Sequence, residues 1–178
     1  MTLPRVTEIL AEVGIIDTRR YAGYSEQRDR GSAVHAACHY DDIGDLDESS
    51  LDPSWIPYLQ GWRKFRSEHV CQWTDVEKRL SNESFTGQPD RRGTVDAHRA
   101  IVDLKTGAKE SWHKIQLAAY CVLTERPFCY RRIVVRLQDD GNYAMDNYSL
   151  ATAEDINLFL SAVAIFNWKR RTNGNGNR

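Results

Sequence analysis

Asp103 and Lys105 are separated by one residue in the segment Ala100-Ile-Val-Asp-Leu-Lys-Thr106, which is otherwise almost entirely apolar. In a β-strand, alternate side chains share a face, so the carboxylate and the ammonium group point the same way. Val102 and Leu104 then point to the opposite, apolar face. Charges within a buried strand are costly unless they are paired or functional. The pattern therefore fits either an ion pair near a strand end or a catalytic pair.

Asp90 is a second carboxylate that the chain can bring to the same place. It lies in Gly87-Gln-Pro-Asp-Arg-Arg-Gly93, on a segment that we expect to pair with the Asp103 strand, and twelve residues lie between the two aspartates. Two adjacent carboxylates repel each other unless a proton or a cation lies between them. Hard oxygen ligands favour Mg²⁺ or Mn²⁺. The Leu104 carbonyl would add an oxygen, and Lys105 would orient a water or stabilise charge on a phosphate.

Four motifs in this order resemble a known nuclease family. Gly87-x-x-Asp90 and Ile101-Val-Asp103-Leu-Lys105-Thr-Gly107 are similar to the PD-(D/E)XK nuclease superfamily, in its RecB-like exonuclease branch. Gln116-Leu-Ala-Ala-Tyr120 resembles the Q-x-x-x-Y helix of that branch, and Arg30-Gly-Ser-Ala-Val-His35 resembles its upstream R-G-x-x-x-H helix. Together they cover most of residues 25–123. The C-terminal hairpin and helix carry no motif of the family.

The resemblance implies a role for each matching residue. It implies that the metal is held by His35, Asp90, Asp103 and the carbonyl of Leu104, and that the catalytic residues are Asp90, Asp103, Lys105, Gln116 and Tyr120. Gln116 and Tyr120 would line the site and position Lys105 or the DNA backbone. A histidine ligand would favour Mn²⁺ somewhat over Mg²⁺. Glu77 is either a further ligand or an ordinary surface glutamate. His39, His69, His98 and His113 match no motif, and we expect them to be structural or exposed.

The expected function is metal-dependent hydrolysis of phosphodiester bonds in DNA. Relatives of this size favour an exonuclease that acts on single-stranded DNA or duplex ends in repair, recombination or phage DNA metabolism. No phosphate-loop pattern precedes Lys105-Thr106, so any helicase motor, like a recombinase, would be a partner protein. Two alternatives stay open. One is a catalytically inactive DNA-binding or assembly module with the same fold, and the other is an RNA-directed nuclease.

Hydrophobic periodicity predicts an α/β fold, in which a central mixed β-sheet is flanked by helices around a PD-(D/E)XK, restriction-endonuclease-like core. Helices are expected at 3–13, at 25 to about 40, around 55–65, at 112–124 and from 152 onward. Strands are expected at 72–80, 85–95 and 99–105, with a hairpin formed by 133–137 and 142–148. The acidic stretch 41–53 between the second and third helices is expected to be a surface loop.

The 178-residue chain has a net charge of −1, so no overall basic field marks a nucleic-acid partner. Basic clusters at 19–20, 63–66, 91–92 and 169–171 are expected to be solvated faces rather than phosphate contacts. We expect one nuclease domain over 1–171 and a disordered tail at 172–178. No membrane span or secretory signal is expected, which favours the cytoplasm of a bacterial or phage-infected cell.

The four cysteines raise the question of an iron–sulfur cluster, which some nucleases carry. They are Cys38, Cys71, Cys121 and Cys129, and no two have the spacing of a Cys-x-x-Cys motif. Cluster ligands usually include a tight local group of cysteines. The scattered positions therefore favour reduced, mostly buried thiols over a cluster.

Overall fold

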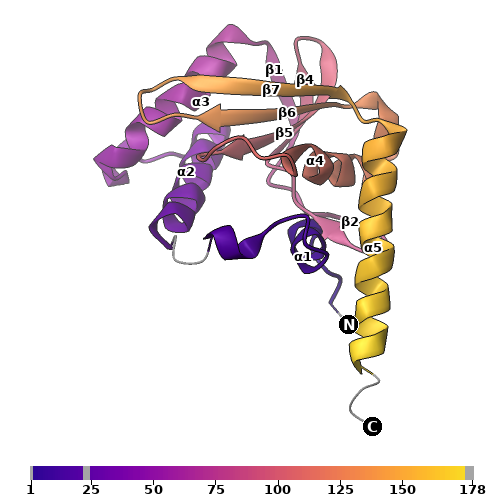
Figure 1. Ribbon diagram of the computed structural model, residues 1–178. Coiled ribbons are helices and arrows are strands. Elements are labelled where there is room, and N and C mark those ends of the chain that lie inside the picture. The colour runs from indigo at the N-terminus through magenta and orange to yellow at the C-terminus, as the bar shows by residue number, and fades with distance from the viewer. Residues whose placement is uncertain (1, 22–24, 175–178) are drawn as a thin grey trace.

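A computed structural model describes residues 2–21 and 25–174, and it is built around a five-stranded sheet (Figure 1). The strand order is β1-β4-β5-β6-β7, with β5 and β6 parallel and the other neighbours antiparallel. The strands of this sheet are β1 (Cys71–Val76), β4 (Arg91–Val95), β5 (His98–Lys105), β6 (Arg131–Leu137) and β7 (Tyr143–Leu150). A separate small ladder pairs β2 (Leu80–Ser81) with β3 (Thr86–Gly87). The mixed α/β fold class expected from the sequence is thus confirmed.

Helices cover both faces of the sheet. The α-helices of the described residues are α1 (Val6–Glu12), α2 (Ser25–Ile43), α3 (Ile56–Glu68), α4 (His113–Val122) and α5 (Ala153–Gly174). Short 3₁₀ turns lie at Thr18–Tyr21, Glu48–Ser50, Pro53–Trp55 and Pro127–Cys129. Helix α4 belongs to the crossover between the parallel strands β5 and β6, as a parallel connection requires. In Figure 1, α2 and α3 lie apart from α1 and α5.

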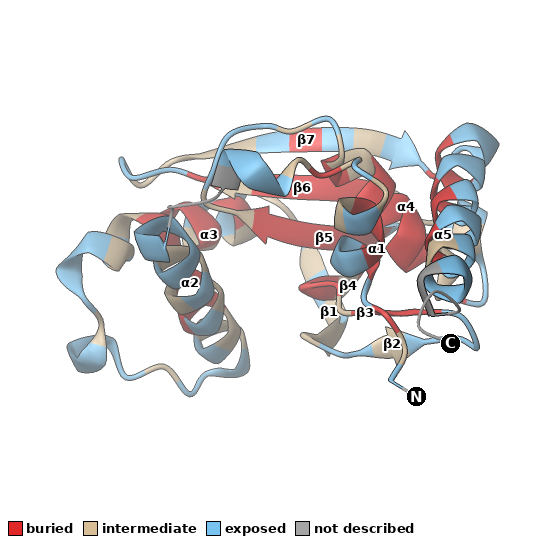
Figure 2. Ribbon diagram, turned by 60° about the horizontal axis from the view of Figure 1, so that its bottom comes forward, coloured by how far each residue is buried: buried red, intermediate tan, exposed pale blue. Residues whose placement is uncertain are grey.

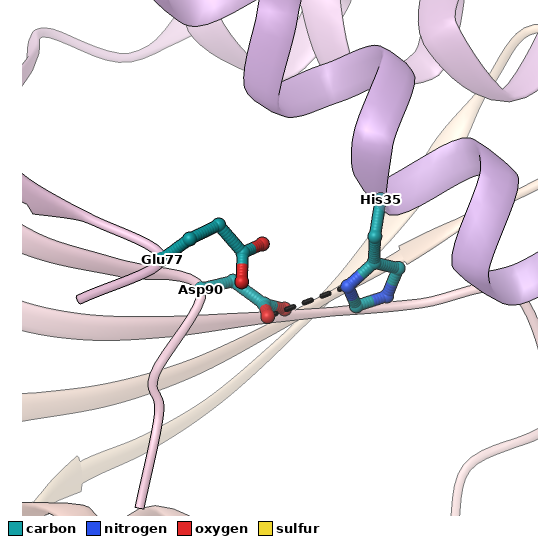
Figure 3. Close-up of side chains that lie close together, drawn as sticks. All are labelled: His35, Glu77 and Asp90. Atoms are coloured by element: carbon teal, nitrogen blue, oxygen red, sulfur yellow. Dashed lines mark ion pairs between the residues drawn. The ribbon is translucent and has the colours of Figure 1, made fainter. Parts of the chain in front are cut away.

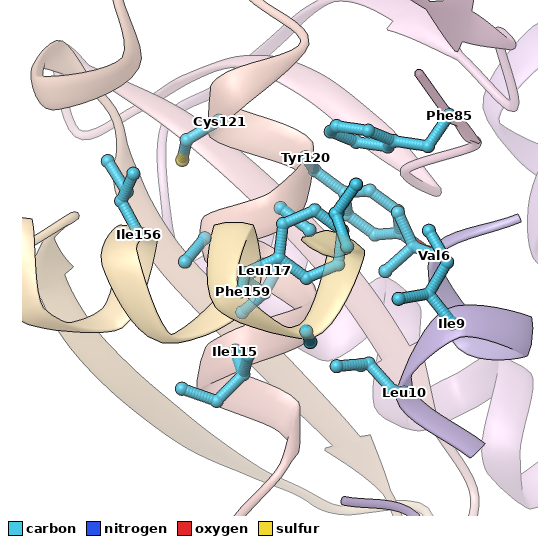
Figure 4. Packing of buried hydrophobic residues seen from close by; sticks show 14 of the residues in the cluster. Val6, Ile9, Leu10, Phe85, Ile115, Leu117, Tyr120, Cys121, Ile156 and Phe159 are labelled. Atoms are coloured by element: carbon cyan, nitrogen blue, oxygen red, sulfur yellow. The ribbon is translucent and has the colours of Figure 1, made fainter. Parts of the chain in front are cut away.

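Strand β5 separates two hydrophobic cores because its side chains alternate between the faces. Ile101 packs with α1, α4 and α5, a core that includes Phe85 and Phe159 (Figure 4). Val102 and Leu104 pack with α2 and α3 on the other side. The central strands are almost wholly buried, as Figure 2 shows. Asp103 and Lys105 therefore lie on the Ile101 face, at the carboxyl end of a strand held from both sides.

The acidic stretch 41–53 was expected to be a surface loop, and this prediction was wrong for its first residues, 41–43. Helix α2 continues to Ile43, and the Asp42 side chain is fully buried. Asp41 forms ion pairs with Arg63 and Arg66 on α3. Charge pairing across the α2–α3 contact therefore extends the helix into a segment whose composition predicts a loop.

Two expected strands are interrupted before they reach the site. The segment 72–80 leaves β1 after Val76, where Glu77 adopts a positive φ of 51°. The segment 85–95 breaks between β3 and β4, so Asp90 immediately precedes a strand rather than lying within one. A tight turn joins β4 to β5, with positive φ at Asp96 and Ala97. These breaks let Glu77 and Asp90 leave the regular ladder at the same edge.

The C-terminal half agrees with the sequence in most respects. Strands β6 and β7 form the expected hairpin, and the Thr152 hydroxyl accepts a hydrogen bond from the Asp155 N–H at the start of α5. On α5, Phe159 and Phe166 are buried in the core, whereas Leu160 is 43% exposed. Helix α5 ends at Gly174, inside the segment 172–178 that was expected to be disordered, and 175–178 lie outside the described residues.

The cysteines are free thiols that the sheet keeps apart. Cys38 and Cys71 belong to the α2–α3 core, whereas Cys121 is buried in the core on the opposite face. Cys129 is exposed and Cys71 is partly buried, whereas the other two of the four thiols, Cys38 and Cys121, are fully buried. Because the sheet lies between them, these cysteines cannot converge on one iron–sulfur cluster. In the described part of the chain, no helix is long and apolar enough to cross a membrane.

Candidate metal centre

Strand register brings Asp90 to Asp103. Arg91 pairs with Val102 in the antiparallel β4–β5 ladder, so the preceding residue, Asp90, lies opposite Asp103. The Leu104 N–H donates a hydrogen bond to Asp90 Oδ2 at 2.5 Å, which fixes that carboxylate against β5. Both aspartates are buried. The structure thus brings together the two carboxylates that the sequence analysis paired, while a ligand role for the Leu104 carbonyl stays a prediction.

Helix α2 contributes His35 to the same place. His35 Nδ1 lies 3.3 Å from Asp90 Oδ1, and the ring projects from the helix toward the carboxylate (Figure 3). Arg30, one helical turn earlier, donates a hydrogen bond to the Thr106 carbonyl at 3.4 Å, just beyond the end of β5. Its guanidinium group also lies over the Tyr58 ring of α3. Arg30 therefore ties α2 to the strand that carries Asp103 and Lys105.

Glu77 completes a group of three side chains with donor atoms close together. Single ligand atoms of His35, Glu77 and Asp90 all lie within 4.8 Å of one another (Figure 3). The Glu77 N–H donates to the Asp90 carbonyl at 2.9 Å, and the positive φ of Glu77 lies at this contact. The β1–β4 register predicts this meeting, because Val76 pairs with Arg91 and so Glu77 comes beside Asp90. From the sequence alone the role of Glu77 was undecided, because the register of β1 is not encoded in a local motif.

Lys105 forms an ion pair with Asp103 Oδ2 on the same face of the sheet. The Asp103 carboxylate is buried, whereas the Lys105 side chain is partly exposed. The Lys105 ammonium also lies 5.6 Å from the centre of the Trp112 ring, a cation–π distance. The structure therefore shows the ion pair at the strand end, while a catalytic role of Asp103 and Lys105 stays a prediction.

Gln116 and Tyr120 lie one turn apart on α4 and face each other. Gln116 Nε2 donates to the Tyr120 hydroxyl at 2.8 Å, and both side chains are buried. The Tyr120 ring packs on Gly87, where a Cβ would lie 2.8 Å from the ring carbons. A glycine at the start of the Gly87-x-x-Asp90 motif is thus required by tight packing against Tyr120. Gln116 Oε1 is buried and has no hydrogen-bond partner among the described residues.

Burial and mutual repulsion shift the pKa values of the acidic groups. Burial raises the pKa of Asp103 to about 6, with Asp90 adding to the rise and Lys105 opposing it. Burial also raises the pKa of Glu77, and the neighbouring Asp90 charge raises it further. Although burial alone would raise the pKa of Asp90, the His35 ring, Lys105 and the Leu104 N–H lower it. Asp103 and Glu77 therefore hold their protons more tightly than free carboxyl groups do, and a bound cation would oppose this by stabilising their charged forms.

His35 responds to the same carboxylates. Burial alone would lower the pKa of its ring, but the charge of Asp90 and the contact with it raise the pKa above its ordinary value. A proton on His35 therefore partly balances Asp90. Deprotonated imidazole and carboxylate groups are the forms that bind metals, so a divalent cation and this proton compete for the same atoms.

A buried arginine fixes the positions of Asp90 and Glu77 from behind, which the sequence analysis did not foresee. Arg91 was expected to belong to a solvated basic cluster but is fully buried, so that prediction was wrong. Its Nη1 donates to the Asp90 carbonyl at 2.7 Å and lies 3.5 Å from Glu77 Oε1. Its Nε donates to Asp42 Oδ2 at 2.5 Å, and its guanidinium group lies over the Trp62 ring. Because side chains alternate along a strand, Asp90 and Arg91 point to opposite faces of the sheet. This alternation predicts the burial of Arg91 only when the strand is known to be buried on both faces.

Two openings flank the cluster. One, of about 350 Å³, is lined by Lys105, Trp112, Arg20 and Gln27 among others. The other, of about 150 Å³, is bordered by Gln88 and Tyr120 together with arginine side chains. The lining arginine side chains in the smaller opening are Arg5 and Arg79. Charged ligands can therefore approach the cluster between basic side chains, although the total charge of the chain is close to zero.

Comparisons with known proteins give weak similarities to solved structures. No family model and no curated protein sequence matches the chain. An alkaline exonuclease from Laribacter hongkongensis is 10% identical, with a TM-score of 0.43 over 96% of this chain and 89% of that one. A phage-related exonuclease from Haemophilus somnus 129PT is 15% identical, with a TM-score of 0.42 over 93% and 92% of the two chains. SSO0001 is 16% identical, with a TM-score of 0.37 over 79% of each chain. Because these TM-scores lie below 0.5, the functional assignment rests on the residues of the site.

Proposed function

We propose that this protein is a divalent-metal-dependent nuclease of the PD-(D/E)XK type that hydrolyses phosphodiester bonds in DNA. The observation that carries the proposal is the convergence of donor atoms from His35, Glu77 and Asp90 within 4.8 Å, with Asp103 opposite Asp90. Carboxylate oxygens and one imidazole form a donor set suited to Mn²⁺ or Mg²⁺. The buried Asp103 carboxylate, which is ion-paired with Lys105, offers a further ligand.

In this proposal the ligands are His35, Asp90 and Asp103, with Glu77 and the Leu104 carbonyl as further oxygen donors. A divalent cation bound there would lower the pKa of a water and neutralise charge on the scissile phosphate. The Leu104 N–H and Arg91 hold the Asp90 side chain and backbone in place before any ligand arrives. Such preorganisation spares the site a rearrangement at the moment of reaction.

In the proposed reaction, Lys105 is the residue that provides electrostatic stabilisation. Its ammonium is held between Asp103 and the Trp112 ring and lines the 350 Å³ opening. From this position it can orient the attacking water or stabilise negative charge that develops on the phosphate. Gln116 and Tyr120 support the site from α4, and the unpartnered Gln116 Oε1 is available to a water or to Lys105. Exonuclease action is proposed from the motif resemblance.

The decisive experiment is digestion of end-labelled single-stranded and double-stranded DNA with Mg²⁺ or Mn²⁺. We expect metal-dependent cleavage of linear DNA and no cleavage of a circular substrate. Cleavage of the circle would replace exonuclease by endonuclease action. An RNA substrate of the same sequence tests the RNA-directed alternative directly.

Calorimetric titration with Mn²⁺ separates an enzyme from an inactive module with the same fold. We expect binding by the natural chain and markedly weaker binding by Asp90→Asn, because neutralising a ligand removes most of its attraction for the cation. Absence of Mn²⁺ binding together with absence of cleavage would overturn the proposal and favour the inactive module.

A further inference from the structure

A polar hollow of about 740 Å³ lies beside α4, on the sheet face that carries Asp103. We name it the β1–β4 hollow, because Gln72 and Thr74 of β1 and Arg92 and Thr94 of β4 form much of its floor. Arg99 at the start of β5 extends this floor. The segment Leu123 to Arg126 after α4, together with Tyr130, forms the rim.

The floor is a row of polar side chains across three neighbouring strands. Thr94 pairs with Gln72 on one side and with Arg99 on the other. The intervening residues Trp73 and Ala100 pack into the α2–α3 core on the opposite face. Because the floor residues alternate with core residues, their side chains are directed to the α4 face by the strands themselves. The hollow is thus a fixed part of the sheet rather than a gap between loops.

The charge of the hollow is positive. Arg92 is held by Asp75, but Arg99 and Arg126 are exposed and form no ion pair within the described part of the chain. Glu125 is the single acidic residue that lines the hollow among the described residues. Threonine and glutamine add neutral hydrogen-bond donors beside the two free guanidinium groups. Arginine, threonine and glutamine side chains are the groups that contact phosphates and sugars in protein–DNA complexes.

The hollow and the proposed active centre lie on the same face of the sheet, and Arg92 and Thr94 of β4 form the partly exposed connection between them, because Ile101 of β5 is buried. Arg99 and Asp103 are on the same face of β5, four residues apart, which corresponds to about 13 Å at about 3.3 Å per residue. A strand of duplex DNA rises about 3.4 Å per nucleotide, so this distance corresponds to about four nucleotides. A polynucleotide bound at the carboxylates can therefore reach the guanidinium groups, whereas a mononucleotide cannot.

We propose that the β1–β4 hollow binds the sugar–phosphate backbone of the DNA substrate about four nucleotides from the scissile bond, through Arg99 and Arg126. This inference rests on the proposed nuclease function. It adds a surface that determines how tightly long substrates are held. Its polar, open lining is unlike that of a small-molecule pocket, which is mostly apolar and enclosed.

The test reverses both charges with Arg99→Glu and Arg126→Glu in one protein. The matched control is Arg170→Glu with Arg171→Glu, which makes the same change in net charge at two exposed arginines near the end of α5. Binding of fluorescent single-stranded DNA of about 20 nucleotides is measured by anisotropy in EDTA, over a range of salt concentrations. Circular dichroism and thermal unfolding establish that each variant is folded.

We expect the hollow variant to bind the long strand about tenfold more weakly, with the slope of log affinity against log salt reduced by about 1.4, since two phosphate contacts to a single strand are lost. The control should leave the salt slope unchanged. In cleavage assays the KM of the hollow variant should rise for long strands but not for strands shorter than about four nucleotides. Arg99→Lys with Arg126→Lys should restore most of the affinity, because charge is retained.

An unchanged salt slope in the hollow variant, or an equal loss in the α5 control, would overturn the inference. An equal KM increase for short and long strands would do so as well, because it would indicate disturbance of the centre itself. The anisotropy measurement needs no cleavage. If the natural chain binds DNA through the hollow but cleaves nothing with either metal, the proposed nuclease function fails while the surface stands.

Discussion

Asp90 and Arg91 are neighbours in sequence, yet they belong to two different buried charge clusters. Arg91 points into the α2–α3 side, where Asp42 also receives the Trp62 indole N–H and pairs with Arg66. We call this group the arginine hub. Asp90 points toward Asp103, Glu77 and His35, which together with Lys105 we call the carboxylate cluster.

The two clusters differ in how their charges are balanced. In the arginine hub, Asp42 accepts bonds from two guanidinium groups and an indole, and its side chain is fully buried. In the carboxylate cluster, three carboxyl groups share Lys105 and His35, the pKa of Asp103 is raised to about 6, and an opening reaches Lys105. Buried charges persist only when they are paired or bind an ion. The Asp42 carboxylate of the hub is thus balanced within the fold, although Arg91 Nη2 and Arg66 Nε have no hydrogen-bond partner among the described residues, whereas in the cluster the proposed metal would complete the balance of charge.

The largest expected effect is a loss of activity when residues of the carboxylate cluster are substituted and the arginine hub is left intact. Asp103→Asn should abolish metal-dependent cleavage, and Lys105→Ala should lower kcat by about 10²–10³-fold, as removal of a single electrostatic group does in other enzymes. The metal-free Asp103→Asn protein should be at least as stable as the natural one, because the cost of burying the Asp103 charge and its repulsion with Asp90 are both removed. Cleavage assays and urea unfolding measure the two effects. Full activity in both purified variants would exclude this site.

Substitution in the arginine hub should show the opposite behaviour, because its main effect is on stability. Arg91→Met leaves the buried Asp42 carboxylate with fewer partners, so the free energy of unfolding should fall by about 3–5 kcal/mol. Urea unfolding measures it, with Arg99→Met as the control because Arg99 is exposed. A decrease in the free energy of unfolding of less than about 1 kcal/mol, which is the range for exposed ion pairs, would contradict the interpretation of the hub as a cluster of buried ion pairs. Any protein that still folds should also bind Mn²⁺ more weakly, since Arg91 holds Asp90 and Glu77.

The contrast also explains what the sequence could predict. Asp90, Asp103, Lys105, Gln116 and Tyr120 are short-range motif positions, and strand alternation with helical spacing suffices to orient them. Arg91 and Asp42 are 49 positions apart, and their pairing depends on helix α2 packing across the sheet. Composition therefore assigned Asp42 to a loop and Arg91 to a solvated cluster. Glu77 lies between these cases, because only the β1–β4 register reveals its position beside Asp90.

A smaller expected effect concerns how the stability of the protein depends on pH through Asp103. Since the pKa of Asp103 is raised from 3.8 to about 6, the folded state holds this proton more tightly than the unfolded chain. The resulting stability is fully present below pH 3.8 and is lost as pH rises toward 6. Metal binding has the opposite sign, because the ligands must lose protons. Thermal unfolding of the metal-free protein between pH 4 and 6 should therefore show a decline that Asp103→Asn removes, while stabilisation by Mn²⁺ should grow over the same range. Stabilisation by Mn²⁺ that is independent of pH would contradict the assignment of Asp103 as a ligand.

The smallest expected effect concerns His113, which lies at the start of α4 close to both the cluster and its opening. Burial, and then the Lys105 ammonium, lower the pKa of this ring to about 4, so it stays neutral in the fold. Its Nδ1 is 3.4 Å from the Glu110 N–H, and an accepting nitrogen must be unprotonated. The unfolded ring takes up a proton below its ordinary pKa of 6.5, so the stability that it contributes is complete above pH 6.5 and is lost as pH falls toward 4. His113→Gln should flatten that part of the profile of unfolding free energy against pH, whereas the exposed His98→Gln should not. An unaltered profile in His113→Gln would contradict the lowered pKa of the His113 ring in the folded protein.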